Sequence, residues 1–268
     1  MIFAGIIGCG TIGSLIAETI VKKFADKIEL AALCDIDREK AERLLKEQQI
    51  NCNVCLRNEL IAKSDLVIEA ASVKVSYEIA KEALIAGKDV LVMSTGGLLG
   101  KTDIFRLADR KGARIYLPSG ALCGLDGVKG AMAANVDSVI LTTRKPPAGL
   151  RGAPYIKEKG IDLDAIKDES VVFEGTVEEA INGFPKNINV AATLSYCGIG
   201  ATRTLVRIIT SPNFTSNSHE IEVRGDFGTL RARTENMPMP DNPKTSYLAA
   251  LSAIAMLKDI TSGVIIGN

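Results

Sequence analysis

A glycine-rich turn near the amino terminus constrains the fold of this 268-residue chain more than any other feature. The apolar run Ile2–Ile7 leads directly into GCGTIG at residues 8–13, after which apolar residues recur at helical spacing as far as residue 24. A second apolar run over residues 29–34 ends at Asp35, 22 positions beyond Gly13. This order of strand, GxGxxG turn, helix and distant acid predicts a dinucleotide site.

The three glycines of this turn have separate roles in such a site. Gly8 allows the tight turn, Gly10 lets the backbone approach a pyrophosphate, and Gly13 lets the helix pack closely on the strand. The helix that begins at Thr11 and Ile12 offers its free N–H groups and the positive end of its dipole to the phosphates.

Asp35 is the residue expected to distinguish the two nicotinamide cofactors. Its carboxylate would accept hydrogen bonds from the adenosine ribose hydroxyls, and its charge would repel a 2′-phosphate. NAD is therefore favoured over NADP, although the nearby Arg38 weakens the preference and leaves use of NADP open. The alternative interpretation is a glycine-rich turn in an α/β domain that binds no ligand.

Strands and helices alternate through the first half of the chain. Helices are expected over residues 12–24, 38–47, 58–63, 75–86 and 102–111, and strands over residues 2–7, 29–34, 52–56, 66–70, 89–93 and 113–117. This rhythm predicts a Rossmann-type, doubly wound parallel sheet. Ligands of such sheets bind beyond the carboxyl ends of the strands. The strand ends expected to line the crevice, besides residues 8–13 and Asp35, carry Ala70, Ala71, Ser94 and Thr95.

The rhythm changes after Pro118, where a glycine-rich junction at residues 119–127 begins a second region. Strands are expected over residues 138–143, 204–210, 219–224 and 228–234, with helices over residues 128–134, 177–181 and from 189, and an exposed loop over residues 146–160. Successive strands favour a largely antiparallel sheet in an α+β domain. A last helix is expected over residues 243–258, with Asn242 as its N-cap. We therefore expect a dinucleotide domain over residues 1–120, a catalytic and oligomerisation domain over residues 121–240, and a final segment, about 241–268, that packs on the first domain.

Charge and composition exclude several classes of partner. Lys and Arg total 32, as do Asp and Glu, so the formal net charge is zero and nucleic acid is not an expected partner. No apolar run approaches the roughly 18 residues of a membrane span, and we expect no signal peptide, because the first residues read as a strand without a basic segment or cleavage site. Six scattered cysteines suit reduced thiols, so we expect a cytoplasmic protein.

Cys52 and Cys55 have the CxxC spacing of zinc and redox sites. There is no second CxxC pair, and the chain has a single histidine far away in sequence. Because a four-ligand zinc site needs more than this, no metal is expected, and the cysteines are interpreted as buried or half-buried residues of a short strand.

The single histidine, His219, is the candidate general base. It begins an expected strand in the sequence Asn217-Ser218-His219, and an imidazole with its ordinary pKa near 6.5 accepts protons at neutral pH. A purely structural histidine is the alternative. If His219 is the base, the rate should rise with pH through a group that titrates near or above the ordinary histidine value.

Cys123 is the competing nucleophile. A thioester-forming aldehyde dehydrogenase would need such a thiol with a lowered pKa, but leucine flanks Cys123 and no basic residue is near it in sequence. Asn187 and Asn189 place two amides at the start of a small-residue helix, where helix capping and ligand binding are compatible roles.

Several short motifs, in order over nearly the whole chain, resemble those of the L-aspartate dehydrogenases, a two-domain NAD(P)-dependent family. The motifs are residues 8–13, 119–121 with Gly124, 186–192, 217–219, and 235–236 through 242–246. The resemblance implies oxidation of L-aspartate to iminoaspartate, which feeds NAD biosynthesis or hydrolyses to oxaloacetate and ammonia.

The resemblance also implies roles for individual residues. His219 matches the catalytic histidine, and Ala121 and Asn189 match positions that contact the dinucleotide. Candidates for holding the substrate, by motif position only, are Lys186, Asn187, Lys244, Thr245 and Ser246. Residues 146–168 match no motif, and Cys123 is not part of the catalytic pattern. We expect the protein to act as a homodimer.

Two other functions remain open at this point. One is another two-domain enzyme of similar build, such as a homoserine dehydrogenase or a dihydrodipicolinate reductase. The other is a nucleotide sensor that keeps the dinucleotide domain without turnover, although a base beside the nicotinamide would be of little use to a sensor.

Overall fold

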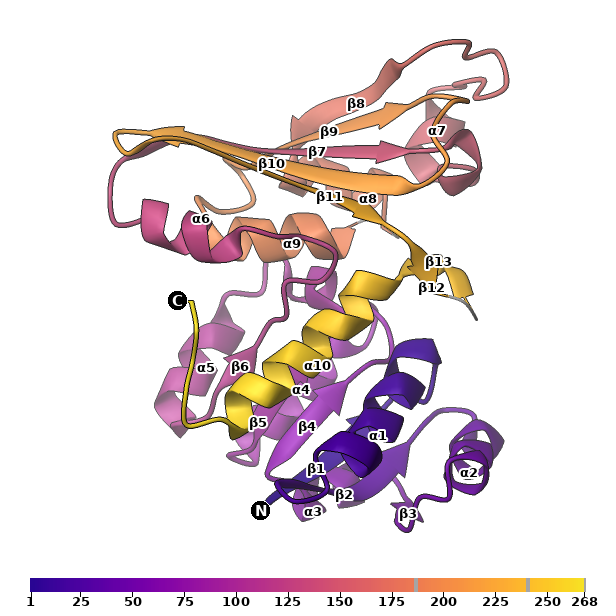
Figure 1. Cartoon of the computed structure of the whole chain (residues 1–268), viewed down its shortest axis with the longest axis vertical. Coiled ribbons are helices and arrows are strands. Elements are labelled where there is room, and N and C mark those ends of the chain that lie inside the picture. The colour runs from indigo at the N-terminus through magenta and orange to yellow at the C-terminus, as the bar shows by residue number, and fades with distance from the viewer. Residues whose placement is uncertain (186–187, 240–241, 268) are drawn as a thin grey trace. The chain divides into compact units, whose positions relative to one another are not determined.

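The apolar runs before residue 118 form a six-stranded parallel sheet (Figure 1). Its strand order is β3-β2-β1-β4-β5-β6, the order of dinucleotide-binding Rossmann sheets. The strands are β1 (Ile2–Ile7), β2 (Ile28–Cys34), β3 (Asn53–Val54), β4 (Leu66–Glu69), β5 (Asp89–Val92) and β6 (Ile115–Tyr116). The computed structural model describes residues 1–185, 188–239 and 242–267 of the chain.

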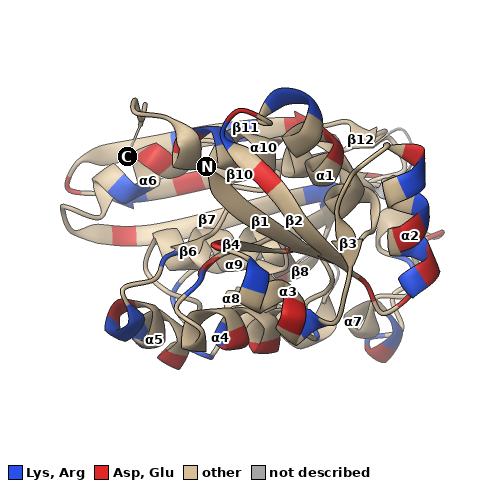
Figure 2. Cartoon of the chain, turned by 90° about the horizontal axis from the view of Figure 1, so that it is seen from below, with Lys and Arg blue, Asp and Glu red and all other residues tan. Residues whose placement is uncertain are grey.

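Helices cover both faces of this sheet, as Figure 2 also shows. On one face, α1 (Thr11–Lys23), α2 (Arg38–Glu47) and α10 (Tyr247–Thr261) share a core with β1 through Ile16, Leu44 and Leu257. On the other face lie α3 (Arg57–Lys63), α4 (Ser76–Ile85) and α5 (Asp103–Lys111). Each element expected before residue 118 is present to within a few residues. The 3₁₀ helix η1 (Thr95–Leu98) was not expected.

The second sheet is mixed but mostly antiparallel. Its order is β11-β10-β7-β9-β8, in which only β7 and β9 pair in parallel. The strands are β7 (Val136–Lys145), β8 (Ser170–Thr176), β9 (Leu205–Thr210), β10 (Asn217–Gly225) and β11 (Gly228–Asn236). The predicted fold class, a Rossmann-type parallel sheet followed by an α+β region with a largely antiparallel sheet, is confirmed.

The two faces of the second sheet differ in chemistry because side chains alternate along each strand. The face under α6 (Leu125–Ala131), α8 (Val177–Gly183) and α9 (Ile188–Cys197) is largely apolar; it includes Leu141 and Ile221, and a Cβ on Gly124 would lie 3.5 Å from Ile221. The opposite face carries ion pairs, such as Arg144 with Glu220 at 2.9 Å.

The prediction of an exposed loop over residues 146–160 is wrong. This segment contains η2 (Pro147–Gly149) and α7 (Pro154–Glu158), and it buries Leu150 and Ile156. Proline suits the first turn of a helix, and the Tyr155 ring packs 5.1 Å, centroid to centroid, from Phe173 of β8. These apolar contacts give a proline- and glycine-rich segment a fixed structure. Strand β8 itself was not expected.

The last helix begins later than expected. Residues 243–246 are not helical, and Asn242 is not an N-cap, because Asn242–Ser246 is strand β13, paired with β12 (Pro238–Met239). Ser246 donates a hydrogen bond to Asn236 at 2.9 Å, and the Tyr247 N–H donates to Met237 at 2.9 Å, which holds the segment extended up to the helix start.

The chain divides into two compact units, and helix α10 contributes to both. The first unit consists of Met1–Pro118 with Ser252–Val264, and the second contains Ser119–Leu251. Ala253 and Leu257 of α10 lie in the core of the first unit.

Candidate functional site

The turn between β1 and α1 leaves no room for side chains at two of its glycines. Gly8 has a φ of +103°, and a Cβ there would lie 2.5 Å from the Ala70 carbonyl. A Cβ on Gly13 would overlap the carbonyl oxygen of Gly8. The turn is thus packed directly against the end of β4 and against its own helix.

Gly10 lies in a different environment. Its position is open, because the nearest atom to a Cβ there would be the Lys40 Nζ at 3.8 Å. Gly10 is also the N-cap of α1, and no side chain caps the helix. The open glycine and the helix start, which has no side-chain cap, form a cradle that fits a pyrophosphate.

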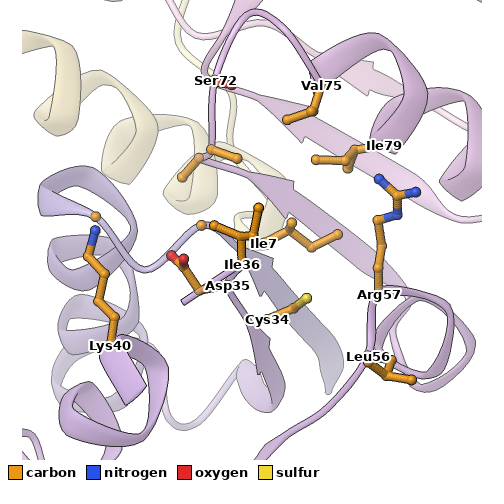
Figure 3. A pocket seen from close by; sticks show the side chains of 14 residues that line it. Ile7, Cys34, Asp35, Ile36, Lys40, Leu56, Arg57, Ser72, Val75 and Ile79 are labelled. Carbon is orange, nitrogen blue, oxygen red and sulfur yellow. The ribbon is translucent and has the colours of Figure 1, made fainter. Parts of the chain in front are cut away.

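A cavity of about 650 Å³ opens beside this cradle (Figure 3). Asp35 points into it, and its carboxylate also accepts hydrogen bonds from the Cys9 N–H at 2.6 Å and the Asp37 N–H at 2.9 Å. Those two bonds fix the orientation of the carboxylate at the cavity. Other lining residues include Ile7, Gly8, Gly10, Cys34, Ile36, Ala70, Ala71 and Ser72.

Two cations line the same cavity. Lys40 of α2 reaches toward Gly10, and Arg57 at the start of α3 lies on the other side in Figure 3, where it pairs with Glu82 at 2.8 Å. Arg38, the basic residue considered from the sequence, is not among the lining residues and instead pairs with Glu42 on the surface of α2. Lys40 could have been identified from the sequence as a residue near this cavity, because it lies one helical turn beyond Asp37, the N-cap of α2.

A buried carboxylate joins the ends of β4 and β5. Glu69 is 0 % exposed, and it accepts hydrogen bonds from the Ala71 and Ser94 N–H groups, both at 2.9 Å. Burial raises the pKa of Glu69, while these hydrogen bonds lower it. Glu69 thus ties the Ala70–Ala71 end of β4 to Ser94, while Thr95 beside it is buried at the start of η1. Sequence reasoning missed this role.

Thr11 and Ile12 lie in the first turn of α1, as expected. The Ile12 side chain packs against the core of the first unit, so only its backbone could serve a ligand at the cradle. The candidate dinucleotide residues of the first half therefore gather at the carboxyl ends of β1, β2, β4 and β5.

His219 lies in the second unit, on the helix-covered face of its sheet. It is 6 % exposed, and its Nδ1 is 3.0 Å from the hydroxyl of Thr143, its cross-strand partner on β7. Burial, and then the positive charge of Lys145, lower the pKa of His219 to about 3. The expectation of a group that titrates near the ordinary histidine value is therefore wrong for His219 in the free protein: its imidazole is neutral at pH 7.

Polar side chains surround His219 at this end of the sheet. The Thr234 hydroxyl donates to the Ala121 carbonyl at 2.7 Å, and Asn236 donates to Thr234 at 3.0 Å. Asn236 also accepts the hydrogen bond from Ser246. Thr234 also donates to the His219 backbone carbonyl at 3.4 Å, so Ala121, the His219 backbone and Ser246 are joined through Thr234 and Asn236, neither of which was a candidate from the sequence.

The remaining candidate site residues lie on α9, on β13 or outside the described residues. Asn189 lies in the first turn of α9 and Thr245 lies on β13. Lys244 belongs to β13, and Lys186 and Asn187 lie outside the described residues.

The pKa of the Cys123 thiol is shifted in the direction opposite to that of an activated nucleophile. Cys123 is partly buried, and burial raises its pKa, so the thiolate is disfavoured at neutral pH. Burial likewise raises the pKa of Cys52 to about 11. Over the residues that the structure describes, no group of three potential ligands is placed to hold a metal ion, and no helix is long and apolar enough to cross a membrane.

Family models match both parts of the chain. Residues 8–118 match the NAD-binding domain of homoserine dehydrogenase, and residues 126–260 match the C-terminal domain of aspartate dehydrogenase.

Curated relatives match the chain over its whole length. It is 48 % identical to an L-aspartate dehydrogenase of Methanosarcina mazei and 43 % identical to one of Methanococcus maripaludis, each over 100 % of both chains. Among solved structures, aspartate dehydrogenase of Thermotoga maritima has a TM-score of 0.76 and 26 % identity over 100 % of both chains. A homoserine dehydrogenase of Thiobacillus denitrificans has a TM-score of 0.64 at 15 % identity, over 97 % of this chain and 73 % of its own, which shows a shared fold.

Proposed function

The chain belongs to the L-aspartate dehydrogenase family, and from this premise we propose that it oxidises L-aspartate to iminoaspartate with NAD as the electron acceptor. It is an oxidoreductase with a domain for a nicotinamide nucleotide. One observation carries the proposal furthest: a buried histidine, neutral at pH 7, lies in the polar end of a sheet whose sequence matches aspartate dehydrogenase. We further propose that the product enters NAD biosynthesis and that the protein works as a cytoplasmic homodimer.

The residues of the first unit fit a dinucleotide. The open space at Gly10, the start of α1 without a side-chain cap and the oriented Asp35 carboxylate match a pyrophosphate followed by a ribose. When bound, the nicotinamide group supplies the acceptor for the hydride of the substrate Cα. On the second unit, we propose that Ala121 and Asn189 contribute to cofactor binding and that Thr245 and Ser246, with Lys186, Asn187 and Lys244, contribute to substrate binding.

His219 would accept a proton during the reaction. The proton comes either from the substrate amine, which must be neutral before hydride leaves Cα, or from the water that hydrolyses the imine to oxaloacetate and ammonia. Either role needs an imidazole that is neutral before the reaction, which the burial of His219 favours, and a pKa that rises when substrate binds, because a base with a pKa of about 3 takes up a proton poorly at neutral pH. Thr143, at 3.0 Å from Nδ1, holds the ring and leaves Nε2 for the proton.

The rival functions predict other substrates or none. A homoserine dehydrogenase would oxidise an alcohol, and a nucleotide sensor would bind NAD without turnover. NADH formation should be measured with L-aspartate, L-glutamate, L-homoserine and L-malate. We expect a rate with L-aspartate that exceeds the others by at least tenfold; a preference for homoserine, or NAD binding with no turnover of any of the four, would overturn the proposal.

The cofactor preference provides a first prediction. Asp35→Ala removes the ribose acceptor and the charge that repels a 2′-phosphate, so the ratio of kcat/KM for NAD to that for NADP should fall. Lys40→Met is the matched control, because it removes a cation from the same cavity and should raise that ratio. A ratio unchanged by Asp35→Ala would mean that Asp35 does not contact the ribose.

Cys123→Ser provides a second prediction. The variant should keep most of the aspartate-dependent rate, because burial raises the pKa of this thiol and no covalent step is required of it. Steady-state rates and a melting curve of the same preparation check this. A folded but inactive Cys123→Ser variant would instead favour a thioester mechanism.

A further inference from the structure

Lys145 shares one face of the second sheet with His219. Thr143 pairs with His219 across β7 and β10, and their side chains are in contact, so both point to the helix-covered face. Lys145 lies two residues beyond Thr143 on the same strand and therefore points to that face as well. Arg144, between them, points to the opposite face and pairs with Glu220.

The surroundings of Lys145 disfavour its positive charge. It is partly buried beside Thr210, which is 0 % exposed, and a Cβ on Gly149 would lie 3.7 Å from the Lys145 stem. Burial lowers the pKa of Lys145 to about 8, so its surroundings disfavour the ammonium form on balance. Thr210, the residue paired with Lys145 on β9, is uncharged. An anion brought next to this group would offset the cost of its burial.

We propose that Lys145 is a further substrate-binding residue whose ammonium group holds a carboxylate of the substrate beside His219. The inference rests on the proposed function for the identity of the substrate, a dicarboxylate whose reacting amine must lie within reach of the His219 imidazole. It was not expected from the sequence, where the strand was predicted to end at Thr143, two residues before Lys145.

The proposal links substrate binding to the protonation of His219. Lys145 is the charged group that lowers the pKa of His219 in addition to burial, whereas Arg144 and Glu220 lie on the other face. A carboxylate paired with Lys145 would offset its charge and raise the pKa of His219. The base would then hold a proton more readily when substrate is present.

The single histidine makes this measurable without turnover. The imidazole resonance of His219 should be followed by NMR from about pH 3, where the lowered titration of the free protein falls, to pH 8, with succinate, which carries two carboxylates but no amine. In the wild-type protein with NAD, we expect succinate to shift the titration of His219 to higher pH, and the neutral isostere succinamide to leave it unchanged. Lys145→Met should raise the pKa of His219 without ligand and lose most of the response to succinate.

Kinetics provide the second readout. Lys145→Met should raise KM for L-aspartate roughly 10- to 100-fold, the loss expected for one charge-assisted hydrogen bond, while KM for NAD stays within about twofold. Its melting temperature should be unchanged or higher, because methionine keeps the stem and removes a buried charge. Arg144→Met, which removes a cation from the opposite face of the same strand, is the control and should keep KM for L-aspartate.

The outcomes separate this inference from the proposed function. An equal response to succinate in the wild-type and Lys145→Met proteins, or no response in either, would overturn the role of Lys145. So would a folded Lys145→Met variant with an unchanged KM for L-aspartate. A wild-type protein that binds succinate through Lys145 but forms no NADH from L-aspartate would instead contradict the proposed function.

Discussion

Replacing His219 with alanine should reduce kcat for L-aspartate by roughly 10²- to 10⁴-fold, the usual contribution of a positioned general base. The affinity for NAD should change little, because the residues that line the dinucleotide cavity belong to the other unit. His219→Asn should be no faster, since an amide can hold a hydrogen bond to Thr143 but cannot take up a proton. Rate, NAD affinity and melting temperature should be measured on one preparation.

The buried imidazole also predicts two dependences on pH. Because the pKa of His219 is lowered to about 3, kcat/KM, which reports the free enzyme, should show no inflection from His219 near pH 6.5. The unfolded chain binds a proton at pH values where the folded chain does not. Stability should therefore be fully present above about pH 6.5 and fall as the pH drops toward 3. This loss should be smaller in His219→Ala.

A structural histidine predicts the reverse pattern. In that case His219→Ala would melt at a lower temperature, and the folded fraction would turn over L-aspartate at a rate near that of the wild-type enzyme. That result would show that His219 is not the general base. The assignment of L-aspartate as substrate would then be supported by family membership alone.

The second large effect concerns two glycines that lie three residues apart. Gly10→Val should cost only about 1 kcal/mol of stability, because the space at Gly10 is open and only the N-cap preference for glycine is lost, but it should weaken NAD binding by at least about tenfold, or about 1.4 kcal/mol. Gly13→Ala should instead destabilise the fold by roughly 1–3 kcal/mol or more, because its Cβ would overlap the Gly8 carbonyl oxygen.

Calorimetry with NAD and thermal unfolding separate the two variants. Gly87→Ala, a change at a surface glycine with no atom near its Cβ position, tests the effect of a strained glycine conformation away from the cavity and should leave NAD binding intact. If Gly10→Val bound NAD as tightly as the wild-type protein, the pyrophosphate would not lie against this turn.

The first unit was predictable from the sequence because its signals are local. Each strand before residue 118 is a short apolar run, and each long helix, such as α1, repeats its apolar residues at helical spacing. The glycine pattern alone indicated the tight turn at Gly8 and the close packing at Gly13. The buried Glu69 was not predictable, because its role depends on two N–H groups at the ends of neighbouring strands.

The second unit was harder to predict because its structure depends on contacts between distant segments. Strand β8 is recognisable only beside β9, and β13 is extended because it pairs with β12. His219 was found because it is the only histidine, whereas its low pKa depends on burial and on Lys145, 74 residues earlier in the chain. Alternation along β7 would have indicated that Thr143 and Lys145 share a face, but not that His219 lies opposite Thr143.

Helix α10 limits how this protein can exchange parts with its relatives. Its early residues belong to the second unit, but Ala253 and Leu257 complete the core of the first. A gene fragment that ends at residue 118 would therefore encode a nucleotide-binding domain with an uncovered apolar face. Recombination through a single crossover near that point would join the helix of one parent to the sheet of another, so chimaeras should fold best when residues 252–261 come from the same parent as residues 1–118.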